Sequence, residues 1–207
     1  MKQIYANIRQ WASDRNIIQG CDLKDQYPKL ISEFGELTDH VDQLHDLVFF
    51  DPEIGYTEQA ICDLQAAIKD DIGDCLVVLT ILAAQNGTEI ENINGGGCAD
   101  KGAHPHSFIL RLAKTLGRLG DAIAKNQTMD IDVTIMAAVD YLSGVAHDYG
   151  LRLSDCAQAA YEDIKDRKGV MYNGTFIKST DPAYEHSCKM VKKLELEDRV
   201  IREVTGQ

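Results

Sequence analysis

Apolar residues recur every three or four positions along almost the whole chain of 207 residues, which is the spacing of one face of an α-helix. This spacing predicts helices over residues 2–14, 25–49, 57–87, 107–125, 131–149, 154–166 and 182–203. Short β-prone runs flank Asn173-Gly174, a dipeptide typical of a two-residue hairpin turn. We therefore predict an all-α fold with a small C-terminal β-hairpin.

A glycine-rich segment, residues 95–106, interrupts the helical pattern and predicts a linker. It would separate a first helical repeat, residues 1–94, from a second one, residues 107–170. Residues 171–207 would hold the hairpin and the last helix.

Two pairs of acids stand at helical spacing inside apolar surroundings. Glu33 and Glu36 lie in "LISEFGEL", and Asp71 and Asp74 lie at the start of the most apolar run of the chain. Side chains three positions apart project from one face of a helix, so each pair offers two carboxylates side by side. A lone pair of this kind is more often a solvated helix face. The apolar neighbours favour a buried cluster of four carboxylates instead.

Such a cluster needs positive charge, because an ionised carboxylate near a core costs several kcal/mol unless a cation neutralises it. Lys29 and Lys69 are too few for this role. A divalent metal can fill it, and ligands that are all oxygen select Mg²⁺, with Mn²⁺ as a possible substitute. The residues thus indicate metal-dependent chemistry on a phosphoanhydride, with Glu33, Glu36, Asp71 and Asp74 as metal ligands and catalytic groups.

The two acid helices resemble those of the MazG-like nucleoside triphosphate pyrophosphohydrolases, relatives of the all-α dUTPases. Their E-x-x-E and E-x-x-D pairs are represented here by Glu33-x-x-Glu36 and Asp71-x-x-Asp74. The segment "YEDIKDRKGVMYNGTFIK" is similar to the C-terminal part of phage-type members. The resemblance implies a helical bundle of the all-α pyrophosphatase type, and an enzyme that converts an NTP or dNTP to the monophosphate and pyrophosphate with Mg²⁺.

Two features depart from that family. Asp71 stands where glutamate is usual, which shortens the reach of the carboxylate by one methylene. In addition, 34 residues separate Glu36 from Asp71, which is more than the family normally has. We expect an inserted loop at about residues 49–60, over the site.

The second half of the chain repeats the first half without its acids. "LISEFGELTDHV" aligns with "LAKTLGRLGDAI", residues 112–123, and a second register aligns residues 80–93 with 143–156. The four acids are then replaced in order by Thr115, Arg118, Thr134 and Ala137. This predicts a monomeric pseudo-dimer with one competent and one degenerate half, or a homodimer of such chains.

The triphosphate needs cations as well. Lys165, Arg167 and Lys168 form a basic cluster, which is either a solvated helix end or a clamp on the phosphates. Three further residues are candidates for substrate contact: Arg118 at the position of Glu36, Gln26 for reading a base edge, and Trp11 for stacking on a base.

The net charge of −12, from 33 Asp and Glu against 21 Lys and Arg, disfavours a nucleic acid polymer or an anionic membrane as a partner. The N-terminus has no apolar signal core, and scattered cysteines such as Cys62, Cys75 and Cys156 are typical of reduced, buried thiols. We expect a cytoplasmic protein.

Two other functions stay open. A helical nucleotide sensor or interaction protein would bind nucleotide without releasing pyrophosphate. An HD-type metal phosphohydrolase would use the His147-Asp148 doublet, but it needs further His and Asp ligands at suitable places.

Overall fold

The computed structural model describes residues 1–49, 58–92 and 105–205. Its elements follow one another as α1 (Lys2–Asp14), α2 (Ile17–Gly20), α3 (Leu23–Phe49), α4 (Glu58–Gln85), a 3₁₀ turn η1 (Ile90–Asn92), α5 (Pro105–Ala124), α6 (Thr128–Asp148), α7 (Leu153–Ile164), β1 (Gly169–Tyr172), β2 (Thr175–Lys178) and α8 (Tyr184–Thr205). The described chain is therefore all-α with a C-terminal β-hairpin, which confirms the predicted fold class.

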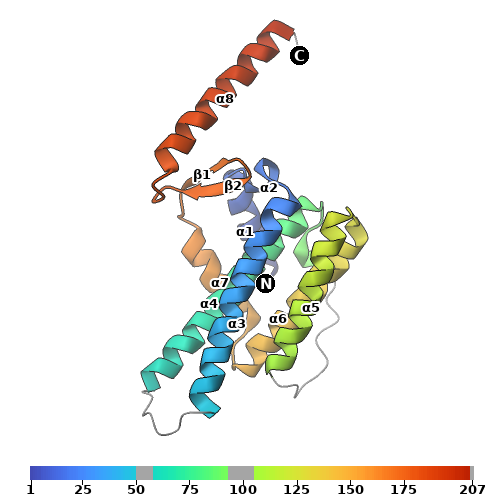
Figure 1. Ribbon diagram of the computed structural model, residues 1–207, viewed down its shortest axis with the longest axis vertical. Helices are drawn as coiled ribbons and strands as arrows, with labels where there is room; N and C mark the ends of the chain where they lie inside the picture. The colour runs from blue at the N-terminus through green and yellow to red at the C-terminus, as the bar shows by residue number, and fades with distance from the viewer. Residues whose placement is uncertain (50–57, 93–104, 206–207) are drawn as a thin grey trace.

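Two antiparallel helical pairs, α3 with α4 and α5 with α6, lie side by side and form the body of the molecule (Figure 1). Helix α4 is the central element, because its run from Cys75 to Ala83 is buried on every side. Helices α1 and α7 pack against α4 on the side away from α5. A helix that is apolar all round must be enclosed in this way.

The two pairs meet through close contacts between α3 and α5. The Tyr27 hydroxyl donates a hydrogen bond to the Leu116 carbonyl oxygen at 2.9 Å. Gly120 lies against the same phenol ring, where a Cβ atom would come within 2.7 Å of the hydroxyl oxygen. A duplicated helical pair would produce this arrangement, and the duplication itself stays a prediction.

Helix α7 approaches α4 most closely at Gly73, which lies between Asp71 and Asp74. A Cβ atom at this position would lie 2.5 Å from the Cys156 carbonyl oxygen, so a larger residue would push the two helices apart. Arg167, which follows α7, lines the same pocket as Glu33 and Asp74. The acid pair and the C-terminal segment thus belong to one region of the fold.

The hairpin and the last helix complete the chain. Strands β1 and β2 pair antiparallel around Asn173 and Gly174, whose positive φ angles of 49° and 74° fit a two-residue turn. Helix α8 contacts the hairpin and extends away from the helical body (Figure 1).

The structure corrects several details of the sequence analysis. Helix α5 begins at Pro105, inside the expected linker, and the rest of that linker lies outside the described residues. Residues 50–57 of the expected inserted loop also lie outside the described residues. Ile31, expected in the core, is 40% exposed, and Cys62 is exposed instead of buried.

Within the described ranges the five cysteines are free thiols. No helix among the described residues combines the length and apolarity that crossing a bilayer requires.

Candidate functional site

The four predicted acids lie on the two packed helices α3 and α4, and two of them, Glu33 and Asp74, line one pocket. Glu33 and Asp71 are 3% and 6% exposed, Asp74 is half-buried, and Glu36 is exposed. Besides burial, the charge of Glu33 raises the pKa of Asp74, and the charge of Glu36 raises that of Asp71. The helices thus bring acids of both pairs near one another, but the exposed Glu36 departs from the buried cluster of four that the sequence predicts.

The closeness of these acids changes their protonation. Burial, followed by the charges of Glu33 and Asp70, raises the pKa of Asp74 to about 7, although Arg167 and Lys29 oppose the shift. Burial also raises the pKa of Asp71. A carboxyl group whose pKa rises in this way lacks sufficient positive charge around it.

Side chains of α3 engage two of the four acids. Lys29 forms an ion pair with Glu33 one helical turn away, and His40 Nδ1 lies 2.7 Å from the Asp71 carboxylate. Among the described residues, no group of three or more His, Cys, Asp or Glu side chains is arranged to hold a metal ion. Carboxylates alone remain a suitable donor set for Mg²⁺, but Lys29 and His40 would have to yield to it.

A cavity of about 200 Å³ adjoins Glu33 and Asp74 and extends under the hairpin. Its lining combines charged groups with an apolar and aromatic wall: Trp11, Ile17, Asp25, Gln26, Lys29, Glu33, Asp74, Val77, Val78, Ile81, Ile164, Arg167, Gly174, Thr175, Phe176 and Lys178. We call it the acid-side pocket. It unites α1, α3, α4 and the C-terminal segment.

Trp11 is the centre of the aromatic wall. Its ring meets Phe176 edge-on, with centroids 6.0 Å apart, and the Arg15 guanidinium lies 5.0 Å from the ring centroid. Its indole Nε1 is buried and has no hydrogen-bond partner among the described residues. Gln26 is also buried and donates to Cys21 Sγ at 3.0 Å. Both predicted base-contacting residues thus line the acid-side pocket.

The structure gives the three residues of the predicted basic cluster different surroundings. Arg167 lines the acid-side pocket and pairs with Asp163, while Lys165 and Lys168 are exposed and are not part of the pocket lining. Lysines that the sequence analysis did not propose as substrate contacts, Lys29 and Lys178, line it instead.

Arg118 lies in a different pocket, of about 480 Å³, on the α5–α6 pair. All four residues that replace the acids are in its lining: Thr115, Arg118, Thr134 and Ala137. The acid-side pocket, by contrast, is lined by two of the four acids, Glu33 and Asp74. Arg118 shares no pocket with Glu33, Asp74 or Arg167, so the structure does not join it to the proposed substrate site.

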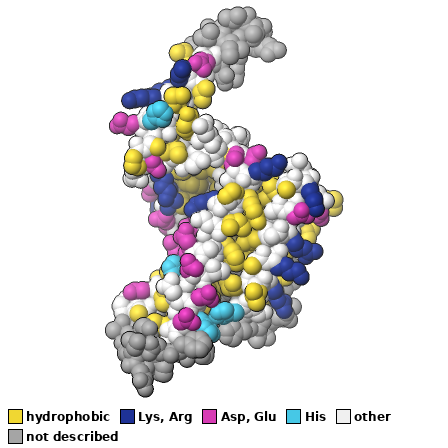
Figure 2. Space-filling model, in the orientation of Figure 1, with side chains coloured by type: hydrophobic (Ala, Val, Ile, Leu, Met, Phe, Trp, Pro, Cys, Tyr) yellow, Lys and Arg dark blue, Asp and Glu magenta, His cyan; other side chains and the backbone are white. Residues whose placement is uncertain are grey.

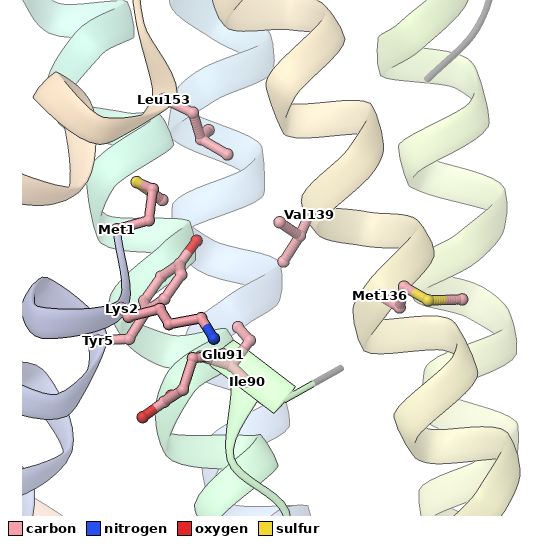
Figure 3. A pocket seen from close by; sticks show the side chains of 8 residues that line it. All are labelled: Met1, Lys2, Tyr5, Ile90, Glu91, Met136, Val139 and Leu153. Atoms are coloured by element: carbon pink, nitrogen blue, oxygen red, sulfur yellow. The ribbon is translucent and has the colours of Figure 1, made fainter. Parts of the chain in front are cut away.

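A third cavity, of about 290 Å³ and mainly apolar, lies between the start of α1, η1 and the helices α6 and α7 (Figure 3). None of the four predicted acids is in its lining. The His147-Asp148 doublet ends α6, where His147 is exposed and lies 3.6 Å from its neighbour's carboxylate. Neither place gathers the groups that the proposed chemistry needs.

Besides Lys178, three residues at the site were not predicted from the sequence. Lys29 was weighed only as a source of charge, although its i,i+4 spacing to Glu33 signals an ion pair on a helix. His40 contacts Asp71, and Arg15 donates a hydrogen bond to the Arg167 backbone. Each contact joins residues far apart in the sequence, so no local spacing predicts it.

One comparison with known proteins finds a relative. A protein of Haemophilus phage HP1, described as an uncharacterized 18.2 kDa protein in the rep-hol intergenic region, is 30% identical over 179 residues, covering 77% of this chain and 97% of the phage protein. The chain belongs to the family of this phage protein. No protein-family model matches the chain, and no solved structure does.

Proposed function

We propose that the protein is a Mg²⁺-dependent nucleoside triphosphate pyrophosphohydrolase, which converts an NTP or dNTP to the monophosphate and pyrophosphate. The observation that carries this proposal is the acid-side pocket, where Glu33 and Asp74 adjoin an aromatic wall and the Arg167 guanidinium. A nucleotide needs these same three surroundings: an apolar slot for the base, cations for the phosphates and carboxylates for a metal. The resemblance to MazG-like enzymes supports the same reading.

The apolar part of the pocket suits a nucleobase. Trp11 and Phe176 offer aromatic faces and edges, and the unpartnered Trp11 Nε1 can donate to a ligand acceptor. The Gln26 amide offers both a donor and an acceptor in the same lining. A buried donor without a partner favours a ligand that satisfies it.

The charged part suits the phosphates. Arg167, Lys29 and Lys178 come from three different elements and line one cavity. Charge-assisted hydrogen bonds from such groups are each worth roughly 1.5 to 3 kcal/mol once desolvated. In this proposal Lys29 leaves Glu33 and contacts the phosphates, which frees the carboxylate.

The carboxylates would hold Mg²⁺, or Mn²⁺ in its place, through oxygen ligands from Glu33, Glu36, Asp71 and Asp74. The raised pKa of Asp74 supports this, because it arises from burial and then from the charges of Glu33 and Asp70, and a divalent cation would offset both. When bound, the metal would supply a Lewis acid for the phosphoryl group and an acidified water. The free cysteines and the acidic surface fit a cytoplasmic enzyme with no nucleic acid polymer as partner.

A panel of all canonical ribo- and deoxyribonucleoside triphosphates, assayed for pyrophosphate with Mg²⁺, tests the proposal. We expect release from at least one nucleotide that stops with EDTA. Absence of release from every nucleotide would overturn it.

A second candidate is a nucleotide sensor without turnover. The ion pairs of Lys29 with Glu33 and of His40 with Asp71 favour it, since they occupy carboxylates that a metal would use. A sensor would bind nucleotide equally well in EDTA and release no pyrophosphate.

A further inference from the structure

The α5–α6 pair carries a pocket that the proposed function does not use. It measures about 480 Å³, within the range of roughly 300 to 1,000 Å³ that small-molecule sites occupy. Its described lining is Lys114, Thr115, Gly117, Arg118, Asp121, Ala122, Gln127, Asp130, Val133, Thr134, Ala137 and Tyr141. We call it the base-side pocket. It shares no lining residue with the acid-side pocket.

The base-side pocket holds two cations, Lys114 and Arg118, and two acids, Asp121 and Asp130. Lys114 and Arg118 stand one helical turn apart on α5, and neither forms an ion pair with a described residue. Asp121 is paired with Lys125 at 2.7 Å, which leaves Asp130 as the unpaired acid among the described lining residues. In a chain with a net charge of −12, two unpaired cations in one pocket mark a local site for an anion.

The neutral part of the lining supplies further hydrogen-bonding groups. Thr134, Tyr141 and Gln127 carry two hydroxyls and an amide into the pocket lining. Thr134 already donates its hydroxyl proton to the backbone at the carbonyls of Asp130 and Ile131. Tyr141 and Gln127 remain as donors for oxygen atoms of a ligand.

The comparison with the acid helices explains why a site stands here. The sequence alignment places Thr115, Arg118, Thr134 and Ala137 opposite Glu33, Glu36, Asp71 and Asp74, and all four of these replacements line the base-side pocket. The exchange removes every carboxylate and introduces a guanidinium. Figure 2 shows the same contrast on a larger scale, with Asp and Glu gathered over α3 and with Lys and Arg over α5.

We infer that the base-side pocket binds a small phosphorylated anion through Arg118 and Lys114, at a site separate from the acid-side pocket. Arg118 offers planar donors that match phosphate oxygens, and Lys114 adds a second cation on the same helical face. No metal is needed, because the pocket itself provides the positive charge. The inference stands whether or not the acid-side pocket is an active site.

Calorimetry with pyrophosphate on the full chain tests the inference, in EDTA so that neither metal binding nor turnover contributes. We expect saturable binding that Arg118→Ala and Lys114→Ala each weaken at least tenfold. The matched control is Lys192→Ala, which removes an exposed lysine of α8 and the same charge. A second variant, Arg167→Ala, measures how much of the binding belongs to the acid-side pocket, whose cations are proposed to contact phosphates, and sulfate at equal ionic strength measures unspecific anion binding.

The outcomes separate cleanly. Binding that falls in Arg118→Ala and Lys114→Ala and persists in Lys192→Ala supports the site, provided that thermal melts show all variants folded. Binding that Arg118→Ala leaves unchanged, that Arg167→Ala abolishes, or that sulfate matches would overturn it, and so would the absence of binding to the wild type.

Discussion

The α3–α4 and α5–α6 pairs share a geometry and differ in chemistry. Both bury apolar residues, and each lines a pocket. The pocket of the first pair holds the acids Glu33 and Asp74, and that of the second holds Thr115, Arg118, Thr134 and Ala137. The comparison teaches that two packed helical pairs can offer pockets with different chemical groups.

The pairs differ also in what covers them. Helix α7 packs closely against α4 at Gly73. Helix α7, the hairpin and the segment between them contribute Ile164, Phe176 and Arg167 to the acid-side pocket. The base-side pocket is lined by α5, α6 and their connection alone. Covering removes water and raises the pKa of Asp74. The covered pair is therefore the one suited to chemistry.

The largest effect should come from removing an acid of the covered pair. Asp74→Asn should lower Mg²⁺-dependent pyrophosphate release by roughly 100-fold or more, since loss of a group that holds a metal costs at least as much as loss of its supporting contacts. The matched control is Asp130→Asn in the base-side pocket, which should leave turnover near normal. Equal losses in both variants would erase the difference between the pairs.

A smaller effect is expected from the basic cluster. Arg167→Ala should raise the KM for the nucleotide about tenfold, because Arg167 lines the acid-side pocket and a charge-assisted contact is worth roughly 1.5 to 3 kcal/mol. Lys168→Ala changes a neighbouring exposed cation that is not in the lining, and its KM should stay unchanged. Similar kinetics for the two variants would refute the distinction that the structure makes between them.

Arg15 should act through its neighbours. Its Nε and Nη2 donate to the carbonyls of Arg167 and Lys165 at 2.7 and 3.0 Å, and its guanidinium lies over Trp11. Arg15→Ala should raise KM about fivefold, equivalent to roughly 1 kcal/mol for a lost hydrogen bond. Because Trp11 is the only tryptophan of the chain, the emission spectrum should change as well.

The control for this prediction is Arg9→Ala on the same helix. Arg9 pairs with Glu89 and Glu91 and is not in the lining of the acid-side pocket. A Trp11 spectrum that Arg15→Ala leaves unaltered would show that Arg15 does not position the aromatic wall.

The smallest effect concerns stability in EDTA. Burial, followed by the charges of Glu33 and Asp70, raises the pKa of Asp74 from its ordinary 3.8 to about 7 in the folded protein, so folding favours its protonated form. Its contribution to stability is fully present below pH 4 and is lost as the pH rises through 7. An asparagine does not ionise, so the Asp74→Asn variant does not lose this stability as the pH rises. The Tm of the variant should therefore exceed that of the wild type by more at pH 8 than at pH 5. Thermal melts at both pH values measure it, and an equal gain would contradict the burial argument.

Periodicity predicted the long helices to within a few residues, because each of them buries a continuous apolar stripe. It could not predict α2 and η1, which span four and three residues and are too short to show a period. The pattern wrongly placed Ile31 in the core, since an apolar residue next to a buried stripe can still face solvent.

The candidate site was predictable where it depends on spacing along one helix. The acids of α3 and α4 and the i,i+4 partner Lys29 are of this kind. The contact of Lys178 with the acid-side pocket depends on how the hairpin lies over α4, and that of Arg15 on how α1 meets α7. Such tertiary placements leave no periodic trace in the sequence.

Binding of Mn²⁺ to the full chain, followed by electron paramagnetic resonance, tests most directly whether the acid pair and its counterpart differ in the ion they hold. The wild type and an Arg118→Ala variant should bind Mn²⁺ alike, and a variant carrying both Glu33→Gln and Asp74→Asn should lose that binding. Undiminished Mn²⁺ binding in the double variant, or none in the wild type, would contradict the account.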